Sequence, residues 1–127
     1  MPNALTKISH LEQDASNFGL NWENTDQIME QILSEVQEIK EQLESSNQEA
    51  SRQALQEEIG DLIHAAFSLC VFCNFEPQET LIKSLDKFER RLTASKELAK
   101  AKGLTTLKGL PFHELMLYWK KAKAKVG

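Results

Sequence analysis

Residues 28–44 read IMEQILSEVQEIKEQLE, an amphipathic pattern from which the fold class follows. Apolar side chains recur every three or four positions, which is the spacing of one face of an α-helix. This face carries Ile28, Ile32, Leu33, Val36, Ile39 and Leu43. Asn24, Thr25 and Asp26 precede it and offer side-chain oxygens that can cap a helix start. We therefore expect a helix that begins near these residues and buries one side against other helices.

The same helical spacing recurs in four further segments of the chain. They cover about residues 4–18, 52–72 and 77–92, and a last segment that Pro111 opens. The stretch from Glu44 to Ser51 is polar and lacks apolar periodicity, so it is expected to form a loop. Each helix has a single apolar face and must bury it against its neighbours. The sequence predicts an all-α fold, a four-helix-type bundle with an additional N-terminal helix.

The bulk composition is that of an ordinary globular domain. The chain has 127 residues, of which 41% are hydrophobic and 27% are charged, and this size suits a single domain. The net charge of −4 argues against a stable nucleic-acid partner, because binding to a phosphate backbone usually needs a basic surface. No apolar signal segment or membrane span is visible, so a cytoplasmic location is expected. Cys70 and Cys73 lie inside an apolar helical pattern and are interpreted as small core residues.

Two pairs of acids lie at the same spacing on neighbouring helices. Glu35 and Glu38 are three residues apart, and so are Glu58 and Asp61. Residues three apart share a helix face, so the like charges within each pair repel. A divalent cation turns this repulsion into coordination, and an all-oxygen ligand set suits Mg²⁺ or Mn²⁺. If the two helices pair antiparallel, all four carboxylates are expected to aim at one point.

The later helices supply cations that suit a phosphate ligand. Lys87 and Arg91 are four residues apart on one stripe, outside the apolar face of their helix. Trp119 and Lys123 repeat this spacing in the last helix, where a tryptophan beside a lysine can stack a base and hold a phosphate. The alternative is that Trp119 is a core anchor and that the lysines complement the C-terminal end of the helix dipole.

Three runs together resemble one known family, the MazG-like, all-α nucleoside triphosphate pyrophosphohydrolases. These runs are SEVQEIKEQLE (34–44), EEIGDLI (57–63) and DKFERR (86–91). The resemblance covers about residues 20–123, so residues 1–127 are expected to form a single MazG-like domain. It also implies a homodimer or homotetramer in which the bundle is completed across subunits.

The resemblance extends to the roles of individual residues. It implies Mg²⁺ ligands at Glu35, Glu38, Glu58 and Asp61, and nucleotide contacts at Lys87, Arg91, Trp119 and Lys123. The implied reaction is hydrolysis of a ribo- or deoxyribonucleoside triphosphate to the monophosphate and pyrophosphate, in the house-cleaning of nucleotide pools. Glu38 is the candidate for orienting or deprotonating the attacking water. Neither the base nor the sugar follows from the sequence.

Two other classes of function are alternatives to this interpretation. In a non-catalytic helical interaction module the acids are merely a solvated face. A di-iron carboxylate bundle requires a Glu-x-x-His motif from each of two helices. His64 does follow Asp61 by three residues, but His10 and His113 have no acid three residues before them. The ligand count therefore disfavours the di-iron class.

Overall fold

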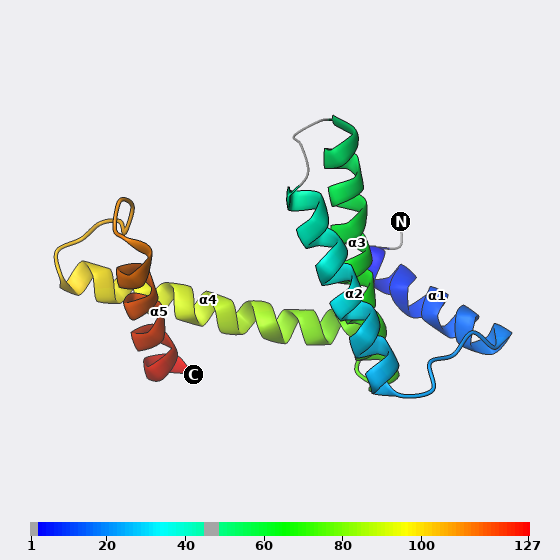
Figure 1. Cartoon of the computed structure of the whole chain (residues 1–127). Helices are drawn as coiled ribbons and strands as arrows, with labels where there is room; N and C mark the ends of the chain where they lie inside the picture. The colour runs from blue at the N-terminus through cyan, green and yellow to red at the C-terminus, as the bar shows by residue number, and fades with distance from the viewer. Residues whose placement is uncertain (1–2, 45–48) are drawn as a thin grey trace. The chain divides into compact units, whose positions relative to one another are not determined.

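The computed structural model describes residues 3–44 and 49–127. These ranges contain five α-helices and no strand (Figure 1). The helices are α1 (Ala4–Phe18), α2 (Thr25–Glu44), α3 (Glu49–Phe72), α4 (Pro77–Ala101) and α5 (Phe112–Val126). The all-α fold class predicted from the sequence is therefore confirmed.

The start of α2 is fixed by one of the three predicted capping residues. The Asn24 side-chain oxygen accepts a hydrogen bond from the Gln27 backbone N–H at 3.0 Å. The Gln27 side-chain oxygen in turn accepts a hydrogen bond from the Glu23 backbone N–H at 2.7 Å. Two N–H groups that have no partner inside the helix are thereby satisfied. This reciprocal cap stabilises the start of α2.

Helix α3 begins earlier than its apolar pattern indicates. The predicted loop from Glu44 to Ser51 is wrong at both ends, because α2 runs through Glu44 and α3 begins at Glu49. Residues 45–48 lie outside the described part of the chain. A polar first turn has no apolar periodicity, yet Glu and Ala are good helix formers. Helix α3 ends at Phe72, and Asn74 then takes a left-handed conformation with φ of 66°.

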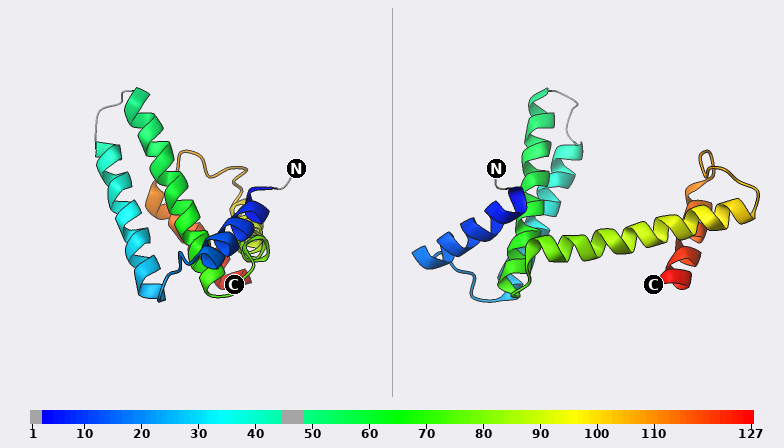
Figure 2. Two further views of the ribbon diagram at one scale, coloured as in Figure 1. Left: turned by 90° about the vertical axis from the view of Figure 1, so that its right-hand side faces the viewer. Right: turned by 180° about the vertical axis from the view of Figure 1, so that it is seen from behind.

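The chain divides into two compact units, residues 1–80 and 81–127. In the first unit α2 and α3 run antiparallel side by side, and α1 packs across α3, as Figures 1 and 2 show. In the second unit the remainder of α4 and α5 are joined by their side chains. The Phe88 and Trp119 rings lie 5.5 Å apart between centroids, and Lys125 pairs with Glu97 at 3.7 Å. The α2–α3 pair is the element that positions the acidic residues.

The buried interior of the described residues is made mainly of small side chains. Its apolar members are Ile28, Ala65, Ala94, Ala99 and Ala122. The stripe predicted to be core on α2 is only partly covered, since Leu33 and Leu43 stay 63% and 64% exposed. The physical reason is that α2 packs against α3 alone within the first unit. A full bundle would cover α2 on more than one side.

The two cysteines differ from each other in exposure. Cys70 is half-buried, and its thiol donates to the Thr80 hydroxyl oxygen at 3.3 Å. Cys73 is exposed, so its interpretation as a core residue is wrong. It lies in the turn that follows α3.

No single helix in the described part of the chain is both long enough and apolar enough to cross a membrane. Two consecutive helical segments, Ser51–Phe72 and Pro77–Ala101, with a bend between them, are together long and apolar enough for a membrane span, by length and composition only.

Candidate metal centre

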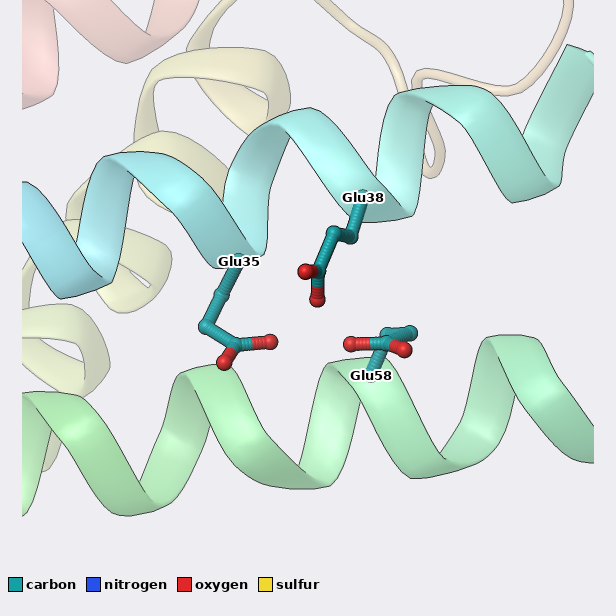
Figure 3. A group of neighbouring side chains, drawn as sticks. All are labelled: Glu35, Glu38 and Glu58. Carbon is teal, nitrogen blue, oxygen red and sulfur yellow. The ribbon is translucent and has the colours of Figure 1, made fainter.

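Three of the four predicted acids converge between α2 and α3. Glu35 and Glu38 project from α2 and Glu58 from α3, and the three carboxylates point toward one another in Figure 3. Each offers one oxygen, and these oxygens all lie within 4.8 Å of one another. The convergence follows from the spacing of the two glutamates on α2 and from the antiparallel pairing of the helices. A hard divalent cation takes oxygen ligands of this kind.

Two oxygens in this group are buried and have no hydrogen-bond donor. They are Oε2 of Glu35 and Oε2 of Glu58. Glu35 is only 6% exposed, and its other oxygen accepts from the Gln31 side-chain amide at 2.7 Å. A buried carboxylate oxygen without a partner is costly, since its lost hydration is not replaced. The three carboxylates, two of which have an unpartnered buried oxygen, therefore form a ligand set that fits a divalent cation.

The crowding of the acids raises the pKa of Glu58 from 4.5 to about 7. The main cause is a hydrogen bond that protonated Glu58 makes with Glu38, followed by one with Glu35. Burial and the negative charges of both neighbours act in the same direction. Without a cation the group thus binds a proton near neutral pH, because three carboxylates this close cannot all ionise cheaply.

Asp61 does not join the three glutamates. It lies three residues after Glu58 on α3, is exposed, and is not among the acids whose oxygens converge. An aspartate is one methylene shorter than a glutamate, so it reaches less far across the gap between two helices. The sequence predicted that four carboxylates meet at one point, and the structure brings together three.

Gln31 is a functional candidate that the sequence interpretation missed. Its amide orients Glu35 from one turn earlier on α2. Residues four apart are neighbours on a helix surface, so this pairing could have been found from spacing alone. A group that orients a ligand from behind is a common feature of metal sites.

His64 lies on α3 near the acids in sequence but has a different partner. Its Nε2 lies 3.0 Å from Oε1 of Glu12 on α1. Among the described residues, the group formed by Glu35, Glu38 and Glu58 is the only cluster of three or more potential metal ligands, and it contains no histidine. The structure therefore gives the di-iron alternative no histidine ligand at this group.

The predicted nucleotide-binding residues all lie in the second unit. Lys87 is exposed, and Nε of Arg91 donates to the Gly127 carbonyl oxygen at 2.9 Å. Trp119 is half-buried and its ring lies against Phe88, while Lys123 is exposed. These contacts of Arg91 and Trp119 are all made with other residues of the second unit.

The two units carry opposite charge, which the net charge of the whole chain conceals. Residues 1–80 contain fifteen acidic and three basic residues, whereas residues 81–127 contain four acidic and twelve basic residues. The formal charges are therefore −12 and +8. An excess of cations on one part of a chain attracts anionic ligands such as phosphates. The acids are therefore concentrated in the first unit and the cations in the second.

Comparison with known proteins agrees with these features. Residues 23–94 match the model of the MazG nucleotide pyrophosphohydrolase domain. The chain is 33% identical over 120 residues to the nucleoside triphosphate pyrophosphohydrolase/pyrophosphatase MazG of Thermotoga maritima. It is 24% identical over 120 residues to the nucleoside triphosphate pyrophosphohydrolase of Escherichia coli K12. Both alignments cover 94% of this chain and 44% of the relative, so the chain spans less than half of their length. The chain belongs to the MazG nucleotide pyrophosphohydrolase domain family.

Proposed function

We propose that this chain hydrolyses nucleoside triphosphates, ribo- or deoxyribo-, to the monophosphate and pyrophosphate in nucleotide-pool house-cleaning. The observation that carries the proposal is the convergence of the Glu35, Glu38 and Glu58 carboxylates. Two of these carboxylates, those of Glu35 and Glu58, each have a buried oxygen that no hydrogen-bond donor contacts. Membership of the MazG domain family and the names of the two relatives support the same reaction.

The three glutamates would hold a divalent cation, Mg²⁺ or Mn²⁺. Asp61, three residues after Glu58 on α3, is proposed as a further ligand. When bound, such an ion neutralises phosphate oxygens and lowers the pKa of a coordinated water. Gln31 keeps Glu35 in its ligating orientation by donating to its other oxygen.

Within this site Glu38 is the proposed general base. It is exposed, whereas Glu35 is buried, so it can reach a water molecule that arrives from solvent. Glu38 would accept a proton from this water as the water oxygen bonds to the α-phosphorus. The bond from the α-phosphorus to the bridging oxygen breaks, and pyrophosphate leaves. Lys87 and Arg91 would offset the charge that grows on pyrophosphate, and Trp119 and Lys123 would flank the nucleotide.

The first test is turnover itself. Purified protein is expected to release pyrophosphate from at least one of the canonical or modified nucleoside triphosphates when Mg²⁺ is present. Addition of EDTA is expected to stop this release. The alternative, a non-catalytic interaction module, predicts no pyrophosphate and no saturable Mg²⁺ binding in calorimetry. A complete panel without pyrophosphate release would rule the enzymatic proposal out.

A homodimer or homotetramer is proposed as the working form. Exposed apolar side chains on both helices of the metal centre favour it, among them Leu33, Ile59 and Ile63 at 63%, 41% and 53% exposure. Large contiguous apolar patches on a protein surface mark sites of association with a partner. We expect light scattering coupled to size exclusion to give a mass of two or four times 14.5 kDa. A concentration-independent mass of one chain would contradict the proposal.

The raised pKa of Glu58 predicts a pH dependence of stability. Protonation of Glu58 favours the folded metal-free protein, because its pKa is about 7 when folded and 4.5 in the reference state. This contribution is complete below about pH 4.5 and is lost as the pH rises through about 7. In EDTA the melting temperature should therefore fall across this window relative to Glu58→Gln, and Mg²⁺ should reverse the fall above pH 7.

Glu41→Gln is the matched control for this experiment, because Glu41 is exposed on α2 outside the cluster. It should keep the pH dependence of the wild type. An identical pH profile in Glu58→Gln and the wild type would show that Glu58 is not the titrating group.

A further inference from the structure

Cys70 and Cys73, the two cysteines of the chain, form a thiol pair at the C-terminal end of α3. Both are free thiols, and the proposed hydrolysis uses neither of them. Cys73 is exposed, whereas Cys70, three residues earlier, is half-buried. The pair therefore combines a thiol that solvent reaches readily with a second thiol that is partly shielded. An accessible cysteine beside a second one that can resolve it is the arrangement found in redox-active pairs.

The helix end that carries the pair is closed by a Schellman motif. The Phe75 N–H donates to the Cys70 carbonyl oxygen at 3.0 Å, and Asn74 takes the left-handed conformation that this motif requires, with φ of 66°. The Cys73 N–H still donates to the Leu69 carbonyl oxygen at 3.0 Å, which is the hydrogen bond of a regular α-helix. The two cysteines therefore keep the helical spacing of residues three apart.

This spacing permits a disulfide but does not favour a relaxed one. Residues three apart in an α-helix have their Cα atoms about 5 Å apart, which is within the range of roughly 4.4–6.8 Å that disulfides span. Their Cβ atoms lie about 5–6 Å apart, whereas a disulfide needs about 4 Å. Closing the bond therefore requires the last turn of α3 to tighten by about 1–2 Å. A bond formed under such distortion is easily reduced again.

The Cys70 thiol also links the end of α3 to the start of α4. Its Sγ lies 3.3 Å from the Thr80 hydroxyl oxygen and 3.5 Å from the Phe75 carbonyl oxygen. The Thr80 hydroxyl donates its own hydrogen to the Glu76 carbonyl oxygen at 2.8 Å, so its oxygen is left to accept from the thiol. A disulfide has no S–H hydrogen. Oxidation of Cys70 therefore removes the donor from both contacts.

A metal site is the other common use of a Cys-x-x-Cys pair. Structural zinc takes four ligands. Within residues 3–44 and 49–127, neither cysteine belongs to a group of three or more potential ligands. The structure therefore favours redox chemistry at this pair over metal binding.

We propose that Cys70 and Cys73 form a reversible dithiol–disulfide pair that low-molecular-weight disulfides oxidise, with Cys73 as the attacking thiol. Cys73 gives its proton to solvent and its sulfur bonds to one sulfur of the small disulfide, whose S–S bond breaks. The sulfur that leaves takes up a proton and departs as a thiol. Cys70 then loses its proton and bonds to Sγ of Cys73, which releases the second small thiol in the same way.

The balance of this exchange is one protein disulfide and two small thiols for each small disulfide consumed. Two electrons pass from the protein to the small disulfide. The oxidised pair no longer donates to Thr80, so the hydrogen bond that joins the start of α4 to α3 is lost. The proposal does not depend on the proposed hydrolysis.

The chemical test uses the full chain, EDTA and glutathione disulfide. The wild type is expected to lose both titratable thiols while its intact mass falls by two hydrogens, and excess reduced glutathione should restore both thiols. Cys70→Ser should instead stop at a mixed disulfide between Cys73 and glutathione, and Cys73→Ser should react more slowly because its remaining thiol is half-buried. A persistent mixed disulfide in the wild type, or chains cross-linked to each other on a non-reducing gel, would overturn the proposal.

The matched control moves one thiol by a single position. The double variant Cys73→Ser, Phe72→Cys keeps two thiols but places them two residues apart, where helical residues do not face each other. It should form mixed disulfides with glutathione and no internal disulfide. An equal yield of internal disulfide in this variant and in the wild type would show that the spacing of Cys70 and Cys73 does not select the pair.

Hydrogen exchange tests the effect on the start of α4. Oxidation is expected to speed exchange about 2- to 10-fold in peptides that cover this turn, as the loss of one hydrogen bond does. Thr80→Val lacks the acceptor, so its exchange should be fast already and should not rise on oxidation. An equal rise in Thr80→Val and the wild type, or no rise in the wild type, would contradict the proposed loss of this contact. These measurements need no nucleotide and no turnover, so they test the thiol pair even if the hydrolytic proposal fails.

Discussion

Glu38→Gln is expected to lower kcat by about 10²- to 10⁴-fold at saturating Mg²⁺, which is the usual contribution of a general base. Glutamine keeps the size of the side chain but cannot accept the proton of the attacking water. It also removes one of the three negative charges that converge between α2 and α3, so Mg²⁺ affinity should fall as well. Pyrophosphate release at several Mg²⁺ concentrations separates these two effects, because only the loss of affinity is recovered by excess metal.

The control for Glu38→Gln is Glu41→Gln, three residues further along the same helix and outside the converging group. It should retain wild-type kcat. The melting temperature of Glu38→Gln without metal should not fall, because the substitution relieves repulsion at Glu58. Wild-type kcat in Glu38→Gln would remove this residue from the proposed mechanism and leave the metal-ligand proposal to Glu35 and Glu58.

Lys87→Ala and Arg91→Ala are each expected to lower kcat by about 10²- to 10³-fold, the size of effect seen when one group that stabilises transition-state charge is removed. Both residues lie on α4 in the basic unit, where cations exceed acids twelve to four. Their proposed role is to offset the charge on departing pyrophosphate. The loss should therefore appear in kcat, measured by single-turnover pyrophosphate release, more than in Mg²⁺ affinity.

Lys96→Ala is the matched control, because Lys96 is an exposed cation of the same helix that no sequence motif marks. An equal loss in Lys96→Ala and Lys87→Ala would show that the basic unit acts through its overall field rather than through two positioned cations. Arg91→Ala also removes a hydrogen bond to the Gly127 carbonyl oxygen, so its melting temperature must be compared with that of Lys87→Ala.

The helices could be predicted closely because their signals are local. Helix α1 runs over the residues that its apolar spacing indicates, and Asn24 caps α2 as its side chain allows. The start of α3 could not be predicted, since a polar first turn at Glu49 has the same composition as a loop. Burial was also predicted less well than helix position. Leu33 belongs to an apolar stripe, but a pattern does not show how many helices surround it.

The candidate metal centre was predictable in part. Spacing places Glu35 and Glu38 on one face of α2, and any two antiparallel helices of this pattern bring a facing acid close. Spacing does not show which acid of α3 has the reach and the direction to meet them. The structure selects Glu58 and leaves Asp61 exposed. The pairing of His64 with Glu12 joins residues 52 positions apart, and no local pattern predicts such a contact.

The order of the amino acids thus specified the all-α class, the family and the side of each helix on which its acids lie, because these depend on periodicity within about a turn or two of helix. The packing of α1 and α2 against α3 set the rest: which three carboxylates meet and which of their oxygens lose their water. Those properties arise between helices, where distances of a few ångströms depend on rotation and register that no single helix fixes.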